Sequence, residues 1–437
     1  MNGVVNPSFA ETIRVFARIG LLSFGGPAGQ IALMHRMLVD ERKWISEPQF
    51  LHALNFCMLL PGPEAQQLAT YIGWLKHGIR GGVVAGVLFV VPGFCVILAL
   101  STVYALFRET QALAGVFFGL KAAVLAVVVE ALLRIGRRAL KNWLMRAIAG
   151  LAFLAIFAFH APFPLIVLAA GLIGYASTRL RPGLFAAVPP APAEASTASG
   201  SWLRAAKVIA VCGALWIAPV ALLGAVFGWD SIYIAIAAFF SKMAVVTFGG
   251  AYAVLSYVAQ QAVENLGWLK PGEMLDGLAL AETTPGPLIL VLTYVGFLAG
   301  FRHPGWASPL AGGLIGASLT TWVTFVPCFL WIFLGAPHIE RLRSNRGLSG
   351  ALAAITAAVV GVILNLTIFL SLNTLFRSVG TLDLGPVSAA WPVWASLDPW
   401  ALALTILAML AMFRLHLGMV PTLALCAALG WLLKAAL

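Results

Sequence analysis

The stretch FARIGLLSFGG at Phe16–Gly26 returns later in the chain as FSKMAVVTFGG at Phe240–Gly250. Phe24 and Phe248 are 224 positions apart, and the same offset pairs two further landmarks, Trp44 with Trp268 and Pro61-Gly62-Pro63 with Pro285-Gly286-Pro287. Three landmarks at one offset predict that the chain consists of two homologous halves.

Composition identifies the class of protein. Of 437 residues, 61% are hydrophobic and only 10% are charged, against about 25% charged in an ordinary soluble domain. This excludes a soluble enzyme, a disordered scaffold and a nucleic-acid binder, despite a formal net charge of +11. Long unbroken apolar runs favour helices over a β-barrel, whose strands would alternate. We therefore expect an all-α polytopic membrane protein.

A spanning helix needs about 20 apolar residues, and on this basis the chain offers about 10–13 membrane segments, some of them broken or re-entrant. A stretch rich in Pro, Ala and Ser divides the chain near its middle. The expected organisation is an N-terminal repeat (1–181), a linker (182–206), a connecting transmembrane helix (207–230) and a C-terminal repeat (231–437).

The two halves are predicted to be inverted relative to each other. The FGG segments are the first and eighth in order, an odd number of crossings apart. Loop charge agrees, because the basic loop of the first half (Arg134–Arg146) and that of the second (Arg341, Arg343 and Arg346) follow non-equivalent segments. Inverted repeats with broken helices are typical of secondary transporters.

Arg18 and Lys242 are equivalent cations, each six residues before its FGG. A cation in an apolar segment costs about 3 kcal/mol or more at mid-bilayer, which favours a functional role for the pair. The alternative is that the side chains reach the interface and are structural.

Paired glycines weaken a helix, and a helix that restarts after them presents free N–H groups to an anion. Pro27 suits the first turn of such a restart. Close helix packing is the alternative explanation of the small residues. The substrate-binding candidates here are Phe24, Gly25, Gly26 and Pro27 in the first copy, and Phe248, Gly249 and Gly250 in the second.

Two prolines in one short motif break a helix more severely, because each removes a backbone donor. Polar side chains surround both copies, which favours a substrate site over a mechanical kink. The candidates are Pro61, Gly62, Pro63 and Gln66, and Thr283, Thr284, Pro285, Gly286 and Pro287.

Four further charged residues lie in apolar segments. Lys121 is a further candidate for substrate binding, and Glu64, Glu282 and Glu130 are candidates for proton coupling, because a buried carboxyl group can carry a proton. Neutral, hydrogen-bonded packing is the alternative for the carboxyl groups. No metal spacing, nucleotide motif or catalytic arrangement is visible, so we expect no metal, no cofactor and no enzymatic activity. The cations and four breaks together predict a site for an anion with several oxygens.

The chain resembles the chromate ion transporter family in its long, two-domain form. The resemblance rests on FGGPAGQIALM, DERKWISEPQF, LLPGPEAQQLATYIGW, FGGAYAVL and TTPGPLILVLTYVGF, and it covers nearly the whole chain. It implies export of chromate from the bacterial cytoplasm and chromate resistance, with sulfate as a structural analogue. It also implicates both FGG and both PGP motifs.

Export of a dianion gains about 4.6 kcal/mol per 100 mV of inside-negative potential, so export needs no coupled ion. The alternatives are import or exchange of sulfate or a related oxyanion, and an anion channel. The expected location is the bacterial plasma membrane, multi-pass, with a cytoplasmic N-terminus. The expected partners are the oxyanion, the lipid bilayer and a second copy in a homodimer, with no nucleic acid.

Overall fold

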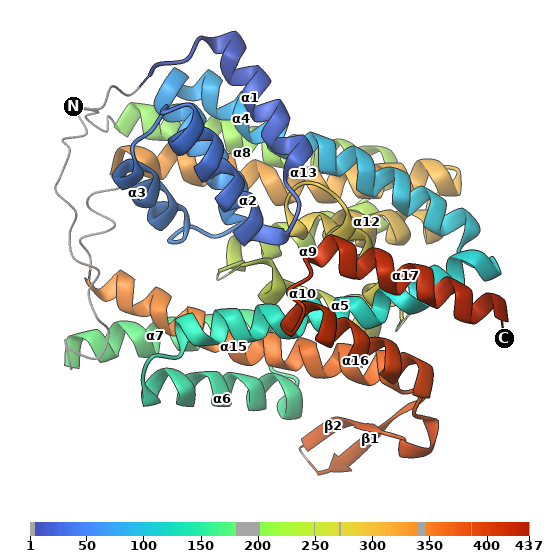
Figure 1. Cartoon of the computed structure of the whole chain (residues 1–437). Coiled ribbons are helices and arrows are strands. Elements are labelled where there is room, and N and C mark those ends of the chain that lie inside the picture. Colours follow the sequence, from blue (N-terminus) through green and yellow to red (C-terminus); the bar gives the residue numbers. More distant parts are fainter. Residues whose placement is uncertain are drawn as a thin grey trace. The chain divides into compact units, whose positions relative to one another are not determined.

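The computed structural model describes residues 5–180, 202–248, 250–270, 272–338, 346–385 and 387–436 (Figure 1). Within them, seven helices are long and apolar enough to cross a membrane, and four shorter helices are also apolar. The predicted all-α polytopic membrane fold is confirmed. Most of the linker, Gly249, Arg341 and Arg343 lie outside the described residues.

The helices of the two halves follow one another in the same order. The first half contains α1 (Phe9–Leu22), α2 (Gly26–His35), a π-helical turn (Arg36–Glu41), α3 (Glu47–Cys57), α4 (Glu64–Phe107), α5 (Gln111–Ala139), α6 (Trp143–Phe159) and α7 (Phe163–Leu180). The second contains α9 (Ile232–Val246), α10 (Ala251–Gln260), a π-helical turn (Gln261–Asn265), α11 (Glu273–Thr283), α12 (Val291–Arg302), α13 (Pro309–Gly335), α15 (Arg346–Leu375), α16 (Pro399–Phe413) and α17 (Met419–Ala436). Short 3₁₀ turns lie at Leu288–Leu290, Ala336–His338 and Trp394–Ser396. Helix α8 (Trp202–Phe227) stands between the halves.

The long helix α4 corresponds to two helices, α12 and α13, in the second half. It bends sharply at His77 and Gly78, where Gly78 has φ +60° and ψ −150°, a conformation essentially restricted to glycine. The two arms pack closely beside this bend, since a methyl group on Gly73 would lie 2.4 Å from the Gly81 carbonyl oxygen. In the second half, residues 303–308 form the loop that separates α12 from α13.

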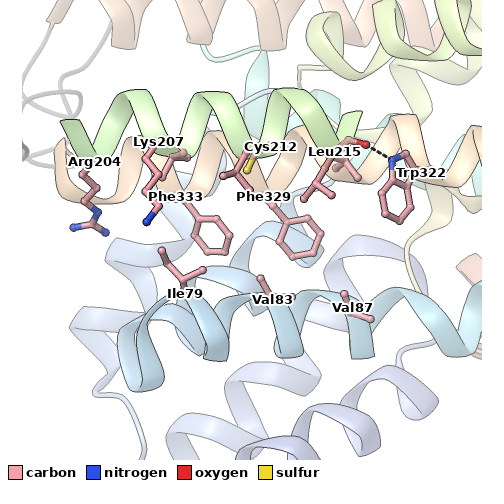
Figure 2. A pocket seen from close by; sticks show the side chains of 13 residues that line it. Ile79, Val83, Val87, Arg204, Lys207, Cys212, Leu215, Trp322, Phe329 and Phe333 are labelled. Carbon is pink, nitrogen blue, oxygen red and sulfur yellow. Dashed lines mark hydrogen bonds between the residues drawn. The ribbon is translucent and has the colours of Figure 1, made fainter. Parts of the chain in front are cut away.

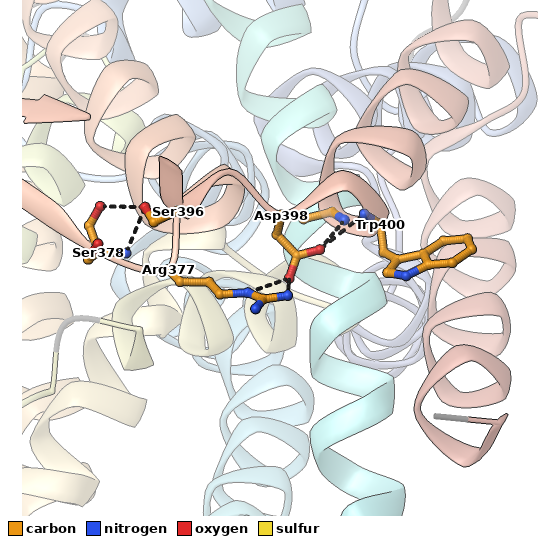
Figure 3. Close-up of polar contacts among 6 residues, drawn as sticks. Arg377, Ser378, Ser396, Asp398 and Trp400 are labelled. Atoms are coloured by element: carbon orange, nitrogen blue, oxygen red, sulfur yellow. Dashed lines mark hydrogen bonds and ion pairs between the residues drawn. The ribbon is translucent and has the colours of Figure 1, made fainter. Parts of the chain in front are cut away.

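A β-hairpin inserted between α15 and α16 was not predicted from the sequence. Strands β1 (Val379–Leu384) and β2 (Val387–Pro392) pair antiparallel, with Gly385 in the turn at φ +67°. Where the hairpin joins its flanking helices, Arg377 forms an ion pair with Asp398 at 3.3 Å, and Asp398 caps the start of α16 by accepting from the Trp400 N–H (Figure 3). These contacts fix both ends of the insertion to the helices that flank it.

The chain forms two compact units, and they do not coincide with the two halves. Unit 1 comprises Met1–Ala99, Tyr175–Ala251 and Thr284–Leu352, and unit 2 comprises Leu100–Gly174, Tyr252–Thr283 and Ala353–Leu437. Each unit therefore takes segments from both repeats. The predicted division into repeats describes the sequence, and each spatial unit needs both of them.

Each unit has its own packed interior. In unit 1, Phe16, Trp44 and Phe89 are among the fully buried side chains of an apolar core. In unit 2, α5 lies beside α17 (Figure 1), and a methyl group on Gly119 would come within 1.8 Å of the Cys426 carbonyl oxygen. Small residues thus bring helix backbones together, as is common in membrane proteins.

Candidate functional site

The predicted helix breaks are confirmed at all four motifs. Helix α1 ends at Leu22 and α2 begins at Gly26, while α3 ends at Cys57 and α4 begins at Glu64. The second half repeats both interruptions, after Val246 and after Thr283. Each break contains a glycine with positive φ, namely Gly25 at +89°, Gly62 at +122°, Gly250 at +98° and Gly286 at +90°. All four breaks lie in unit 1.

Hydrogen bonds connect the breaks in a crossed pattern. The Gly286 N–H donates to the Ser23 carbonyl oxygen over 2.8 Å, and the Gly62 N–H donates to the Thr247 carbonyl oxygen over 2.8 Å. Ser23 and Thr247 occupy equivalent positions of the repeat, as do Gly62 and Gly286. Each PGP motif is therefore bound to the FGG break of the other half. We call these four segments the linked breaks.

The pair around Ser23 and Gly286 has an additional buried partner. The Gln30 amide donates to the Gly286 carbonyl oxygen over 2.5 Å and lies 3.5 Å from the Ser23 carbonyl oxygen. Gln30 is 1% exposed. The equivalent position in the second half is Val254, which cannot make these bonds. The linked breaks are therefore symmetric in backbone and asymmetric in side chains.

The pair around Gly62 and Thr247 has different neighbours. The Gln67 amide donates to the Pro61 carbonyl oxygen over 2.7 Å. Cys328, on α13, packs against the same glycine, because a methyl group on Gly62 would lie 2.9 Å from Cys328 Sγ and 2.9 Å from Gln67 Nε2. One turn earlier, Thr324 Oγ1 is buried and has no hydrogen-bond partner among the described residues.

Helix α4 contacts both pairs. Gln66 is buried and donates to Thr70 Oγ1 over 3.1 Å, and a methyl group on Gly86 would come within 2.3 Å of that same oxygen. Seven residues further along α4, a methyl group on Gly93 would come within 2.2 Å of the Pro285 carbonyl oxygen. Seven residues of helix rise about 10 Å. The long arm of α4 therefore connects the surroundings of the two pairs.

The predicted cations lie on the outside of their helices. Arg18 and Lys242 are both exposed, while their neighbours Phe16 and Phe240 are fully buried. Phe24 is also exposed, at 38%. Glu64 is half-buried as the first residue of α4, where a carboxylate interacts favourably with the positive end of the helix. The structure thus brings the four motifs together, but leaves Arg18 and Lys242 at the surface of unit 1.

The remaining candidates, Lys121, Glu130, Glu282 and Thr283, belong to unit 2. Lys121 Nζ lies 3.2 Å from Asp276 Oδ1 in an ion pair, and Tyr104 donates to the other oxygen of the same carboxylate over 2.7 Å. Beside this pair, Arg108 forms an ion pair with the fully buried Glu273. Lys121 therefore has a protein carboxylate as its partner.

Two of the proton-coupling candidates differ in their surroundings. Glu282 is 2% exposed and accepts a hydrogen bond from the Tyr252 hydroxyl over 2.7 Å. Glu130 lies 3.8 Å from Arg134 in an ion pair whose side chains are each 39% exposed. The Thr283 hydroxyl donates to the Leu280 carbonyl oxygen one turn earlier on its own helix. Of these residues, Glu282 is the buried carboxyl group.

Sequence reasoning missed several residues at the linked breaks. Ser23 and Thr247 stand at equivalent positions within the quoted repeat, so their shared hydroxyl character was a usable signal. Each hydroxyl donates to a carbonyl oxygen one turn earlier, Ile19 and Met243 respectively, which are again equivalent. Gln30, Cys328 and Thr324 gave no comparable signal, because each is a single residue within a helix.

Comparison with known proteins identifies the family. A family model described as chromate transporter matches residues 10–175 and 234–431. A chromate transport protein of Pseudomonas aeruginosa is 35% identical over 375 residues, covering 85% of this chain and 83% of the relative. One from Cupriavidus metallidurans is 28% identical, with 83% and 82% covered, and a probable chromate transport protein of Synechococcus elongatus is 27% identical, with 85% and 87% covered. No solved structure matches. With both halves matched and one relative above 30% identity, this chain belongs to the chromate transporter family.

Proposed function

We propose that this protein transports chromate across a bacterial plasma membrane and exports it from the cytoplasm. Membership of the family supports chromate as the substrate, as do the names of the three relatives. Direction, energy source and the residues that bind the ion are our inference. The observation that carries the proposal is the set of linked breaks, which gathers four helix interruptions in one unit.

The linked breaks offer the donors that a tetrahedral oxyanion requires. Helices α2 and α4 both begin at breaks, and the first N–H groups of a helix have no carbonyl partner within it. The same ends carry the positive pole of the helix dipole. The Gln66 and Gln67 amides and the Thr324 hydroxyl add buried polar groups, each with hydrogen-bonding capacity that no described residue uses. The unused atoms of the two amides are acceptor oxygens, so each amide would have to turn by 180° and give up its present bond, to Thr70 or to the Pro61 carbonyl oxygen, before its NH₂ group could donate to an oxyanion.

The crossed hydrogen bonds fit a mechanism of alternating access. Each PGP motif and the FGG break bound to it come from opposite halves, so a movement of the first-half segments of unit 1 against its second-half segments would change both bonds. Because the two bonds are equivalent, the inward-open and outward-open states would differ little in energy if one bond formed as the other broke. This favours a carrier over a channel.

Chromate export can be driven by the membrane potential alone. A dianion leaving an inside-negative cell gains about 4.6 kcal/mol per 100 mV, enough for roughly a thousandfold gradient. Proton antiport would add to this, with Glu282 as the strongest candidate among the three carboxyl groups because it is buried. Sulfate has the same charge and shape, so sulfate transport is the alternative that the same donors would support.

We assign Arg18 and Lys242 an electrostatic role. They lie six residues before the breaks, about 9 Å along the helix, and are exposed. At that distance a cation raises the local concentration of an anion without contacting it in the bound state. Replacement by alanine should therefore raise the KM for chromate more than it lowers the maximal rate, and Arg18→Lys should preserve transport.

The test uses right-side-out membrane vesicles preloaded with radiolabelled chromate or sulfate, with the membrane potential clamped by potassium and valinomycin. Parent, Arg18→Ala, Lys242→Ala and Gln66→Leu are compared, with Arg14→Ala as a matched control on the exposed side of α1. We expect potential-driven chromate efflux in the parent and in Arg14→Ala, a raised KM in the two cation variants, and loss of efflux in Gln66→Leu. Absence of chromate efflux from the parent at any potential would refute export. Normal kinetics in both cation variants would make these residues structural.

A further inference from the structure

Helices α4, α8 and α13 of unit 1 enclose an apolar groove of about 430 Å³ that plays no part in the proposed transport (Figure 2). Its floor contains Val208 and Cys212, both 8% exposed. Val83 and Val211 on its rim are 41% and 50% exposed. The groove is thus a furrow with a buried floor and an accessible edge, and not a closed cavity of the core.

Charge is confined to one end of the groove. Arg204 and Lys207 lie on the first two turns of α8, and Trp322 lies at the opposite end, where its indole N–H donates to the Leu215 carbonyl oxygen over 2.7 Å (Figure 2). Arg204 also lies over the Trp74 ring at 5.9 Å. Among the described residues, neither Arg204 nor Lys207 forms an ion pair with a carboxylate. Both cations therefore have charge available for an anion.

The length of the groove matches one leaflet of a bilayer. Arg204 and Leu215 are eleven residues apart on α8, a rise of about 16 Å. Half of a hydrocarbon core of about 30 Å is about 15 Å. An acyl chain whose headgroup lies beside the cations would therefore reach the end of the groove near the bilayer centre.

We propose that this groove binds one anionic phospholipid, with its phosphate between Arg204 and Lys207 and an acyl chain along Val83, Val211 and Leu215. Basic residues beside an apolar furrow between membrane helices recognise anionic lipid headgroups through charge, while the furrow takes the chain by apolar burial. The occupant is not the transported oxyanion, because away from the charged end the lining offers a chromate ion only the weak Cys212 S–H donor, since the Trp322 N–H is bonded to the Leu215 carbonyl oxygen. The lipid would fix α8, the helix without a counterpart in the repeat, against α4 and α13.

Native mass spectrometry of the purified full chain in a mild non-ionic detergent tests this proposal. The probes are dioleoyl phosphatidylglycerol and dioleoyl phosphatidylcholine, which differ in headgroup charge but share their acyl chains. We expect the parent to bind one phosphatidylglycerol in preference to phosphatidylcholine. The Arg204→Gln/Lys207→Gln variant should lose about fivefold in affinity for each cation removed. Val211→Trp should fill the groove and weaken both lipids.

Matched controls separate this site from general effects. Ile209→Trp adds the same bulk on the same helix at an exposed position outside the groove, and Arg137→Gln/Arg138→Gln removes two cations elsewhere. Both should bind lipid as the parent does. Competition with dihexanoyl phosphatidylglycerol and with free glycerol phosphate needs no variant: neither should displace the long-chain lipid at equal concentration.

Four results would overturn the proposal. The first is equal binding of the two lipids by the parent, and the second is unchanged preference in the Arg204→Gln/Lys207→Gln variant. The third is displacement by glycerol phosphate, which would indicate an anion site without a lipid. A parent dimer that Val211→Trp dissociates without changing lipid binding would instead assign the groove to a second copy of the chain.

Discussion

The Gly286 N–H donates to the Ser23 carbonyl oxygen over 2.8 Å, and the equivalent Gly62 N–H donates to the Thr247 carbonyl oxygen over the same distance. Each bond joins a PGP motif of one half to an FGG break of the other. Neither half therefore supplies the hydrogen-bond partners for the backbone groups at its own break. An unpaired buried backbone group costs about as much free energy as a lost hydrogen bond. The breaks are stable only when both halves are folded together.

Gly62→Ala should abolish transport. The residue has φ +122°, and the added methyl group would lie 2.9 Å from Cys328 Sγ and from Gln67 Nε2. Backbone strain of about 1–3 kcal/mol and the steric clash of the methyl group would both weaken the hydrogen bond from the residue 62 N–H to the Thr247 carbonyl oxygen. Chromate flux in vesicles, normalised to the amount of folded protein, measures the effect.

Two further variants separate strain from collision. Gly250→Ala also has positive φ, at +98°, but its methyl group would meet no atom within 4 Å, so it should retain more activity. Cys328→Ala in the Gly62→Ala background removes one of the two colliding atoms and should restore part of the flux. If Gly62→Ala were as active as the parent, the crossed bonds would not be needed for transport.

Gln30→Leu should lower stability by about 1–3 kcal/mol, because it leaves the buried Gly286 carbonyl oxygen without its amide donor. Thermal unfolding in detergent measures the loss. Gln111→Leu is the control, since that exposed amide makes one surface bond, to the Lys434 carbonyl oxygen, and should change stability by less than about 0.5 kcal/mol. If the two substitutions lowered stability equally, the Gln30 hydrogen bond would not contribute to the stability of the linked breaks.

Local sequence signals predicted the elements that depend on local physics. Paired glycines and Pro-Gly-Pro end helices wherever they occur, so all four breaks could be located from the sequence. Two Val-Pro pairs, Val91-Pro92 and Val326-Pro327, also correspond in the repeat, and both prolines lie inside long helices, α4 and α13.

What the sequence did not predict depends on contacts between distant residues. Nothing near Ser23 indicates that its partner is Gly286, because the bond spans the two repeats. Lys121 was assigned to the substrate for its charge alone, and only the fold brings Asp276 to 3.2 Å from it. The hairpin at 379–392 was missed because its strands are short and follow a long apolar helix.

Lys121→Gln should destabilise the protein by about 3–5 kcal/mol, because it leaves the buried Asp276 carboxylate without its cation. The double variant Lys121→Gln/Asp276→Asn should recover most of that stability. Unfolding temperature and chromate flux are measured on all three variants. Recovery of flux with stability would make Lys121 structural, whereas a stable double variant without flux would return it to the substrate site.

His35 should give the stability of unit 1 a pH dependence. Its hydrogen bond to Glu47 raises the pKa of the imidazole, burial opposes this, and Asp40 at 3.3 Å adds to the rise. Because the pKa is raised on folding, this contribution is complete below the unfolded value of 6.5 and is lost as the pH rises through the folded value. His35→Gln should remove that part of the profile of unfolding temperature against pH, and Glu47→Gln should reduce it. A parent profile that the His35 substitution leaves unchanged would contradict the assignment.

Glu282 should make chromate export respond to a pH gradient. It is the buried carboxyl group among the three candidates, and the Tyr252 hydroxyl holds it at 2.7 Å. With the membrane potential clamped at zero, each coupled proton should change the steady-state chromate ratio by about tenfold per pH unit. Glu282→Gln should abolish that response while leaving potential-driven efflux, and Tyr252→Phe should weaken it.

Glu130→Gln is the matched control, since that carboxylate is partly exposed beside Arg134 and should behave as the parent. If the steady-state chromate ratio in parent vesicles did not change with the pH gradient, proton coupling would be excluded. A response that survives Glu282→Gln would transfer the role to Glu64, because that carboxylate begins α4 at the linked breaks themselves.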